Sequence, residues 1–208
     1  MREIVDMTSG TNTRVIGIIG PPCSGKSTVA EFVQSLGGVW LNADKIAKEQ
    51  LGNPDVIGQL VESFGNGILA VDGTLSRERI ADLVFGEDAA SQARLKKLES
   101  IIHPRTRAII REALCEAKDR DTAYVILDVP LLLESGWQDE CDEVWCLQVS
   151  PERHEALLAA RGWDAAELQR REKRQLSWQE KRRRSDWVIA NDGSVEDLQM
   201  KVRERLNR

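Results

Sequence analysis

One stretch of the sequence places small residues, a lysine and two hydroxyl residues at a spacing suited to phosphate binding. Residues 20–28 are GPPCSGKST, and Gly20, Gly25, Lys26 and Ser27 fit the pattern G-x-x-x-x-G-K-[ST]. In loops with this pattern, backbone N–H groups surround the phosphates, the lysine reaches the β- and γ-phosphates, and the hydroxyl binds Mg²⁺. The loop therefore predicts a site for a nucleoside triphosphate and Mg²⁺.

The segments on either side of the loop support this interpretation. The apolar run VIGII precedes it as a strand, and VAEFVQSL follows it with apolar residues at helical spacing. A glycine-rich turn that matches by chance is the alternative, but it would not require these flanking elements. Pro21 and Pro22 have no backbone N–H, so the donors must come mainly from the residues after them. The expected phosphate-binding residues are Gly20, Cys23, Ser24, Gly25, Lys26, Ser27 and Thr28.

Two aspartates follow predicted strands, at positions where a carboxylate can assist phosphoryl transfer. Asp44, in the segment NADKIAKEQ, is the candidate base that accepts the proton of an acceptor hydroxyl. The alternative is that Asp44 only caps the following helix. Asp128 ends the run YVILD and is the candidate that holds Mg²⁺ through water, although it is equally suited to capping the turn before Pro130. The absence of an N-K-x-D tetrapeptide disfavours a regulatory GTPase.

A basic segment interrupts an otherwise acidic chain. Residues 161–184 contain nine Lys/Arg and four Asp/Glu, a net charge of +5, whereas the remaining 20 basic and 30 acidic residues give −10. This distribution disfavours a general nucleic-acid surface and indicates one local anion site. We expect a mobile lid over residues 161–185, in which Arg161, Arg171 and Lys181 approach the transferring phosphate. A solvated helix face is the alternative.

Helical patterns alternate with short aliphatic runs, which is typical of an α/β fold with a parallel sheet covered on both faces. Strands are predicted at residues 14–19, 39–41, 124–129, 143–149 and 187–190. Helices are predicted at residues 55–64, 77–85 and 89–118, the last interrupted near His103-Pro104 because proline removes a backbone donor. A helix capped by Ser150, with Pro151 at its first position, follows the fourth strand, and a second helix begins at Asp164.

The length of 208 residues predicts a single domain. We assign residues 1–12 to a loose tail and residues 13–41, 119–160 and 186–208 to a nucleotide-binding core. Residues 44–118 form a predicted helical region that binds the acceptor. No apolar run approaches the ~18 residues needed to span a bilayer, so we expect no membrane association and a cytoplasmic location. The cysteines form no C-x-x-C pair, which disfavours a zinc site.

Six separated segments resemble the dephospho-CoA kinase family, in the order in which that family has them. They are GIIGPPCSGKSTVAEF, NADKIAKE, DGTLSRERIADLVF, LESIIHPRTR, LDVPLLLES and RREKRQLSWQEKRRRSDWVIANDG. The resemblance covers nearly all of the chain after its tail. Three features depart from the family pattern: Asn42 replaces the first aspartate of D-A-D, Pro-Pro-Cys replaces a glycine-rich loop centre, and Ser185 replaces a common alanine. The second aspartate, Asp44, is retained.

The resemblance implies a P-loop kinase fold with five parallel strands, and transfer of the ATP γ-phosphoryl group to the ribose 3′-hydroxyl of dephospho-CoA, with Mg²⁺. It implies Asp44, Lys26 and Arg161 as catalytic residues, and an acceptor site near His103 and Arg105 with Glu134 at its rim. Asn191 follows the last strand, so its loop is expected to hold the adenine; a simple Asn-Asp-Gly turn is the alternative. A monomer is expected to suffice for activity, and the sequence leaves the oligomeric state open.

Two other functions remain compatible with a phosphate loop. A nucleoside monophosphate kinase such as adenylate kinase shares the loop and the lid, and its loop opening is similar to the GPP found here. The segments DVPLLLE and HP disfavour that alternative. A nucleotide-dependent interaction module would hydrolyse ATP without phosphorylating a small molecule.

Overall fold

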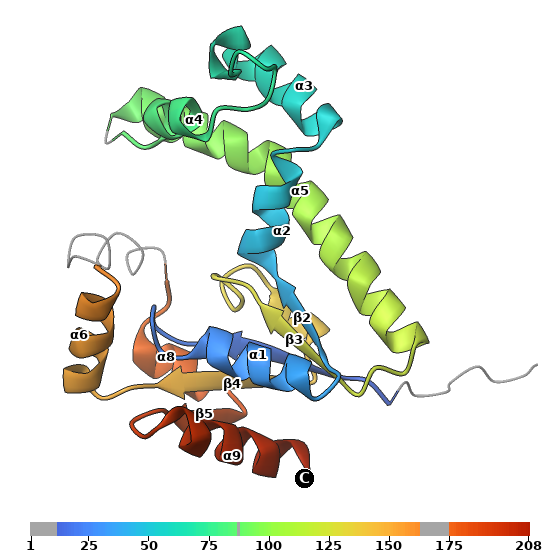
Figure 1. The fold of residues 1–208 in the computed structure, drawn as a ribbon, viewed down its shortest axis with the longest axis vertical. Coiled ribbons are helices and arrows are strands. Elements are labelled where there is room, and N and C mark those ends of the chain that lie inside the picture. The colour runs from blue at the N-terminus through green and yellow to red at the C-terminus, as the bar shows by residue number, and fades with distance from the viewer. Residues whose placement is uncertain (1–11, 87, 163–174) are drawn as a thin grey trace, which may run out of the picture. The chain divides into compact units, whose positions relative to one another are not determined.

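A five-stranded parallel sheet is the centre of the first of two structural units (Figure 1). The computed structural model describes residues 12–86, 88–162 and 175–208. The described residues of Met1–Leu41 and Leu114–Arg208 form this unit, and Asn42–Ala113 forms the second. The strands, in the spatial order β2-β3-β1-β4-β5, are β1 Arg14–Ile19, β2 Val39–Asn42, β3 Tyr124–Asp128, β4 Glu143–Gln148 and β5 Trp187–Ala190.

The α/β fold and its five predicted strands are confirmed, with small differences at the strand ends. The second strand extends to Asn42, while the third and fourth end at Asp128 and Gln148, one residue earlier than expected. In β1, every residue after Arg14 is buried. Such a continuous apolar run is typical of a parallel strand that is covered on both faces.

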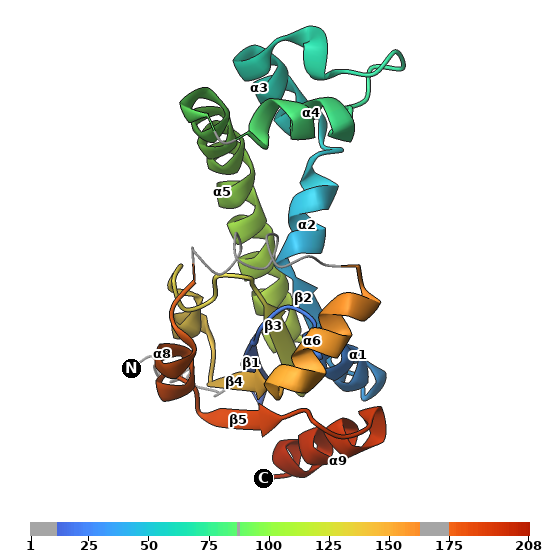
Figure 2. The same ribbon diagram turned by 90° about the vertical axis from the view of Figure 1, so that its left-hand side faces the viewer.

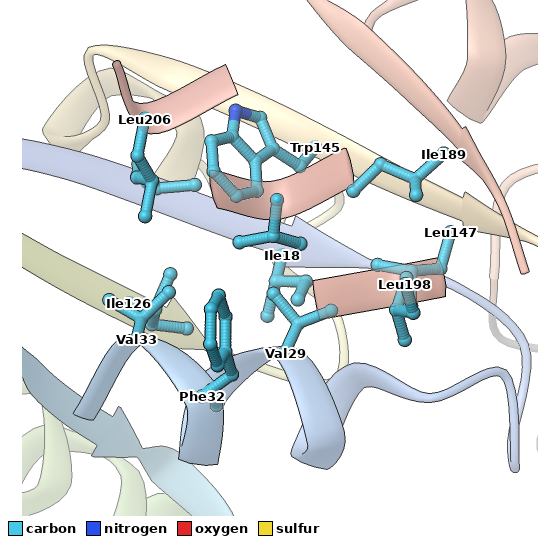
Figure 3. Packing of buried hydrophobic residues seen from close by; sticks show 13 residues of the cluster. Ile18, Val29, Phe32, Val33, Ile126, Trp145, Leu147, Ile189, Leu198 and Leu206 are labelled. Carbon is cyan, nitrogen blue, oxygen red and sulfur yellow. The ribbon is translucent and has the colours of Figure 1, made fainter. Parts of the chain in front are cut away.

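Helices α1 (Lys26–Ser35) and α9 (Val195–Leu206) pack against each other and share one core with the sheet (Figure 3). In α1, Val29, Phe32 and Val33 are buried at the spacing of one helical face. The core also contains Trp145, which is fully buried and meets Trp187 edge-on at 5.0 Å between ring centroids. The described residues of this unit also include α6 (Pro151–Ala160), α8 (Trp178–Arg183) and the short 3-10 helix η2 (Trp137–Glu140).

Glu143, at the start of β4, links this strand to β1 and to α9. Its carboxylate pairs with Arg14 of β1, with Arg205 of α9 at 2.9 Å, and accepts a 2.8 Å hydrogen bond from Trp145 Nε1. Burial acts to raise the pKa of Glu143, but the hydrogen bonds from Trp145, Arg14 and Arg205 outweigh it and hold the pKa below its usual value. The ionised carboxylate therefore stabilises the position of α9.

The second unit is helical and has its own core. Its helices are α2 (Ala43–Gln50), α3 (Pro54–Phe64), α4 (Arg77–Val84), the 3-10 helix η1 (Asn66–Ile68) and most of α5 (Ala89–Asp119), whose last turns belong to the first unit. Helices α3 and α4 lie beside the first half of α5 (Figures 1 and 2). Val56, Leu60, Ile80 and Ile102 are among the buried residues that hold these helices together.

The predicted interruption near His103-Pro104 is wrong, because α5 runs through Pro104 without a break. Proline removes one intrahelical hydrogen bond. The residues before and after Pro104 nevertheless stay helical. Ile102 is buried in the second unit's core, and Thr106 Oγ1 donates a 3.0 Å hydrogen bond to the Ile102 carbonyl. Core packing of Ile102 and the local Thr106 hydrogen bond therefore support the helix where the local rule predicts a break. None of the helices in the described part of the chain has the length and apolarity needed to cross a membrane.

Candidate active site

The phosphate loop joins the buried strand β1 to the helix α1, as the sequence predicts. Gly25 immediately precedes α1 with φ of 100°, a left-handed conformation that favours glycine. A side chain there would also place its Cβ 2.5 Å from Asn191 Nδ2. Cys23 has φ of 61°, which is uncommon for a residue with a side chain. Alternation of left- and right-handed residues turns successive N–H groups toward one concavity and produces an anion site.

Asn191, the residue after β5, makes a hydrogen bond to the phosphate loop. Its Nδ2 donates a 2.8 Å hydrogen bond to the Ser24 carbonyl, and its backbone N donates to the Gln148 carbonyl at 2.8 Å. Both Asn191 and Ser24 are buried. The side chain of Asn191 therefore holds the phosphate loop. That the loop after Asn191 binds the adenine stays a prediction.

The side chain of Lys26 folds back onto the phosphate loop. Its Nζ donates hydrogen bonds to the carbonyl oxygens of Gly20 at 2.9 Å and Pro21 at 2.8 Å. Burial lowers the pKa of Lys26 from 10.5 to about 8, and the nearby carboxylate of Asp128 acts in the opposite direction. The lysine is thus charged at neutral pH and already close to the carboxylate that was predicted to hold the metal.

Two of the predicted lid cations belong to the same electrostatic environment. Lys181 and, more weakly, Arg161 lower the pKa of Lys26 by charge repulsion. Arg161 is exposed at the C-terminal end of α6, whereas Lys181 is only 4% exposed and its ammonium binds the side chain of Gln175. Arg171, the third predicted cation, lies outside the described residues.

Glu134 has a contact that sequence reasoning did not foresee. Its Oε1 accepts a 2.7 Å hydrogen bond from the backbone N of Leu176, which lies just after the end of the range 163–174. Glu134 therefore anchors the chain at the C-terminal side of the proposed lid. Its expected position at the rim of an acceptor site stays a prediction.

The remaining residues predicted for metal binding lie at element ends. Ser27 is in the first turn of α1, and Asp128 is the last residue of β3, which pairs directly with β1. Among the residues that the structure describes, no group of three or more His, Cys, Asp and Glu side chains is placed to hold a metal. A hydroxyl and one carboxylate suit Mg²⁺, which keeps most of its ligands as water and substrate phosphate.

In the second unit, the structure separates the roles of Asn42 and Asp44. The Asn42 side chain accepts the backbone N–H of Lys45 at 2.8 Å, so Asn42 is the cap of α2. Asp44 lies in the first turn of that helix, exposed. The alternative that Asp44 serves as the helix cap is therefore wrong.

The predicted acceptor residues His103 and Arg105 lie two positions apart on α5, so their side chains leave the helix in nearly opposite directions. His103 is exposed. Arg105 Nε donates to Gln50 Oε1 at 3.2 Å, and its guanidinium lies 3.4 Å from the Asp55 carboxylate. Arg105 thereby joins α5 to α2 and α3, and its guanidinium is oriented by those contacts within the second unit.

Sequence reasoning missed His154, whose ring contacts the phosphate loop. His154 Nε2 lies 2.8 Å from the carbonyl oxygen of Pro22. The predicted cap at Ser150 is confirmed and places the first turn of α6 directly after β4, at the edge of the sheet where the phosphate loop also lies. The sequence predicts where α6 begins. It does not show which face of α6 contacts the phosphate loop.

Comparison with known proteins matches nearly the whole chain to dephospho-CoA kinases. The family model described as dephospho-CoA kinase matches residues 14–197. A dephospho-CoA kinase from Rhodopirellula baltica is 58% identical over 199 residues, which are 96% of this chain and 92% of the relative. One from Symbiobacterium thermophilum is 38% identical, over 91% of this chain and 78% of the relative.

Solved structures share the fold. A crystal structure of a protein from Thermus thermophilus aligns with a TM-score of 0.72 and 33% identity, covering 94% of this chain and 97% of that one. A dephospho-CoA kinase from Campylobacter jejuni aligns with a TM-score of 0.67, with the same coverage of both chains. At 21% identity, the second structure supports the fold alone.

Proposed function

The chain belongs to the dephospho-CoA kinase family, and from this premise we propose how its residues transfer the γ-phosphoryl group of ATP to the ribose 3′-hydroxyl of dephospho-CoA. The reaction forms a bond between the acceptor oxygen and the γ-phosphorus and breaks the bond from that phosphorus to the β–γ bridging oxygen. ADP and CoA are the products. The observation that carries the proposal is the family's phosphate loop, formed here between β1 and α1 with its lysine bound to the Gly20 and Pro21 carbonyls.

The phosphate loop binds the donor. The N–H groups of the residues from Cys23 to Thr28 surround the β- and γ-phosphates at the start of α1, where the helix dipole also favours negative charge. Lys26 exchanges its bonds to the Gly20 and Pro21 carbonyls for bonds to phosphate oxygens. Ser27 and Asp128 would hold Mg²⁺, which when bound offsets the charge of the β- and γ-phosphates.

Asp44 is the proposed base. Phosphoryl transfer requires the attacking hydroxyl to be aimed in line with the leaving oxygen and to give up its proton. Asn42 supplies the cap of α2, which leaves the Asp44 carboxylate for that work, and the chain reaches Asp44 directly from the carboxyl end of β2. The carboxyl ends of the strands are where sheets of this type bind their ligands.

The remaining charged residues divide between acceptor and lid. We assign His103 and Arg105 to the anionic acceptor, since His103 is the histidine of the L-x-x-I-x-H-P motif on α5 and Arg105 directly follows that motif. Glu134 serves at the rim and holds Leu176, which lies within the range assigned to the lid. Arg161 and Lys181 stabilise the charge on the transferring group, and Arg171 is assigned the same role from the sequence alone.

The same assignment covers location and assembly. We propose a cytoplasmic enzyme, in keeping with the family's role in CoA synthesis. We also propose that a monomer suffices for activity.

A panel of acceptors tests the proposed function. The protein is incubated with ATP and Mg²⁺ and, separately, with dephospho-CoA, AMP, CMP or pantothenate, and the products are identified by mass. Dephospho-CoA alone should gain a phosphoryl group. Phosphorylation of AMP without that of dephospho-CoA would identify a nucleoside monophosphate kinase, and ATP loss without a phosphorylated acceptor would identify a nucleotide-dependent interaction module.

A further inference from the structure

His154 makes a contact that the reaction, as described so far, does not use. It lies in the first turns of α6, and its Nε2 lies 2.8 Å from the Pro22 carbonyl oxygen in the phosphate loop. A carbonyl oxygen only accepts hydrogen bonds, so the ring must donate, and the hydrogen is on Nε2.

The geometry of the peptide bond gives this contact a consequence for phosphate binding. The Pro22 carbonyl and the Cys23 N–H belong to one planar peptide unit, which is trans in this structure. In a trans peptide the C=O and N–H groups point in opposite directions. A side chain that fixes the carbonyl on one side therefore fixes the N–H on the other.

This particular N–H matters more here than in a glycine-rich loop. Pro21 and Pro22 have no N–H, so Cys23 is the first loop residue after Gly20 that can donate to a phosphate. Cys23 also has φ of 61°, a conformation that a residue with a side chain adopts only when its surroundings hold it there. The loop thus depends on outside contacts to keep the Cys23 N–H turned toward the phosphates.

The first turn of α6 also contacts the second loop that supports the site. The backbone N of Ser150 donates to Asp192 Oδ1 at 2.7 Å, next to Asn191, whose side chain holds the Ser24 carbonyl. The start of α6 is therefore connected to the phosphate loop directly through His154, and indirectly through the loop after β5. These two connections restrict the loop on both sides of Cys23.

We propose that His154 is a positioning residue for ATP: by binding the Pro22 carbonyl, it orients the Cys23 N–H toward the nucleotide phosphates. His154 itself does not touch the substrate. It also links the phosphate loop to α6. This inference rests on the proposed function of the loop as the ATP site.

Three variants of the full-length chain test the proposal. His154→Ala removes the donor; His154→Gln replaces it with an amide N–H that can reach a similar position. Glu155→Ala is the matched control, because Glu155 is the exposed next residue of α6. Alanine favours helix more than histidine does, so a loss of ATP affinity in His154→Ala cannot be assigned to unfolding of α6. ATP binding is measured by calorimetry without acceptor, and KM is measured for both substrates.

We expect His154→Ala to weaken ATP binding about three- to tenfold, the range expected for one hydrogen bond. The KM for dephospho-CoA and the melting temperature of the nucleotide-free protein should stay close to the parent values. His154→Gln should recover most of the ATP affinity, and Glu155→Ala should match the parent.

Two results would overturn the proposal: ATP affinity in His154→Ala equal to that of the parent, or a loss that His154→Gln shares in full, which would show that ring packing and not the hydrogen bond matters. A failure of the proposed function is separate from both. If the parent does not bind ATP, the loop is not the ATP site; if it binds ATP but does not phosphorylate dephospho-CoA, the binding comparison still decides the role of His154.

Discussion

Asn42 and Asp44 show how neighbouring residues with similar chemistry take different roles. Both can cap a helix, and the sequence leaves open which one does. In the structure, Asn42 accepts the Lys45 N–H, and Asp44 stands exposed in the first turn of α2. The asparagine that stands where the family has its first aspartate thus caps α2, and the retained aspartate remains the candidate base.

Replacing Asp44 with asparagine tests that assignment. Asp44→Asn keeps the size of the side chain but removes the base and its charge, so we expect kcat to fall by ~10² to 10⁴ while ATP affinity changes little. Steady-state kinetics and calorimetry measure the two quantities. Glu49→Gln, at an exposed position of the same helix, is the control. A folded Asp44→Asn variant with nearly parental kcat would move the search for the base to Asp128.

Lys26 should make ATP binding depend on pH in the alkaline range. Burial lowers its pKa to about 8 in the free protein, and bound phosphate must raise it, because negative charge favours the ammonium. Affinity should therefore be constant below about pH 8 and fall as pH rises above it, with uptake of a proton on binding.

Calorimetry in buffers with different heats of ionisation measures this proton uptake directly. It should be clear near pH 9 and small near pH 7, and Lys26→Arg should abolish it because arginine stays charged throughout this range. Equal uptake in the parent and in Lys26→Arg would assign the proton to another group.

At the scale of elements, the sequence was sufficient where local chemistry decides the structure. The five strands follow from runs of aliphatic residues, and the phosphate loop and the cap at Ser150 follow from residue type and spacing. It was insufficient where distant residues decide. Packing of Ile102 keeps α5 continuous through Pro104, and Asn191 meets Ser24 across 167 positions of sequence. Neither contact leaves a local pattern.

The Glu143 cluster gives a prediction about how α9 is held to the sheet. Glu143→Gln removes the charge that pairs with Arg14 and Arg205 but leaves an acceptor for Trp145, so we expect a loss of about 2 kcal/mol in the free energy of unfolding. Denaturant titration measures it. The exposed pair Glu116–Arg120 is the control, and Glu116→Gln should cost less than about 0.5 kcal/mol.

This difference should also depend on pH. The pKa of Glu143 is lowered in the folded protein, so its contribution is present above the usual glutamate value of 4.5 and is lost as pH falls through the folded-state pKa. The parent and Glu143→Gln should therefore become equally stable at low pH. A difference between them that persists in acid would show that packing, and not charge, holds α9.

At the scale of the whole molecule, the chain has two units with separate cores. The first contains every described residue assigned to ATP, and the second contains Asp44 and the residues assigned to the acceptor, except Glu134. The sequence predicted a helical region at residues 44–118, and the second unit is Asn42–Ala113. The boundary between the two units is predictable from the sequence because one long helical stretch interrupts the alternation of strand and helix patterns.

Loss of a proposed lid cation should slow phosphoryl transfer strongly. Arg161 is exposed in this structure, so Arg161→Ala should leave ATP affinity nearly unchanged but lower kcat by ~10³ to 10⁵, as for arginines that stabilise a transferring phosphoryl group. Arg183→Ala, another exposed arginine of the basic segment, is the control. An equal loss of ATP affinity and of kcat would place Arg161 in the resting nucleotide site.

Transfer of a labelled phosphate tests the central claim most directly. The protein is given ATP labelled in its γ-phosphate together with dephospho-CoA and Mg²⁺, and the position of the label in the product is determined by mass spectrometry of fragments. The account predicts that the label is recovered on the ribose 3′-oxygen of CoA, in amounts equal to the ADP formed. Label recovered only as inorganic phosphate, or on another group of the acceptor, would contradict it.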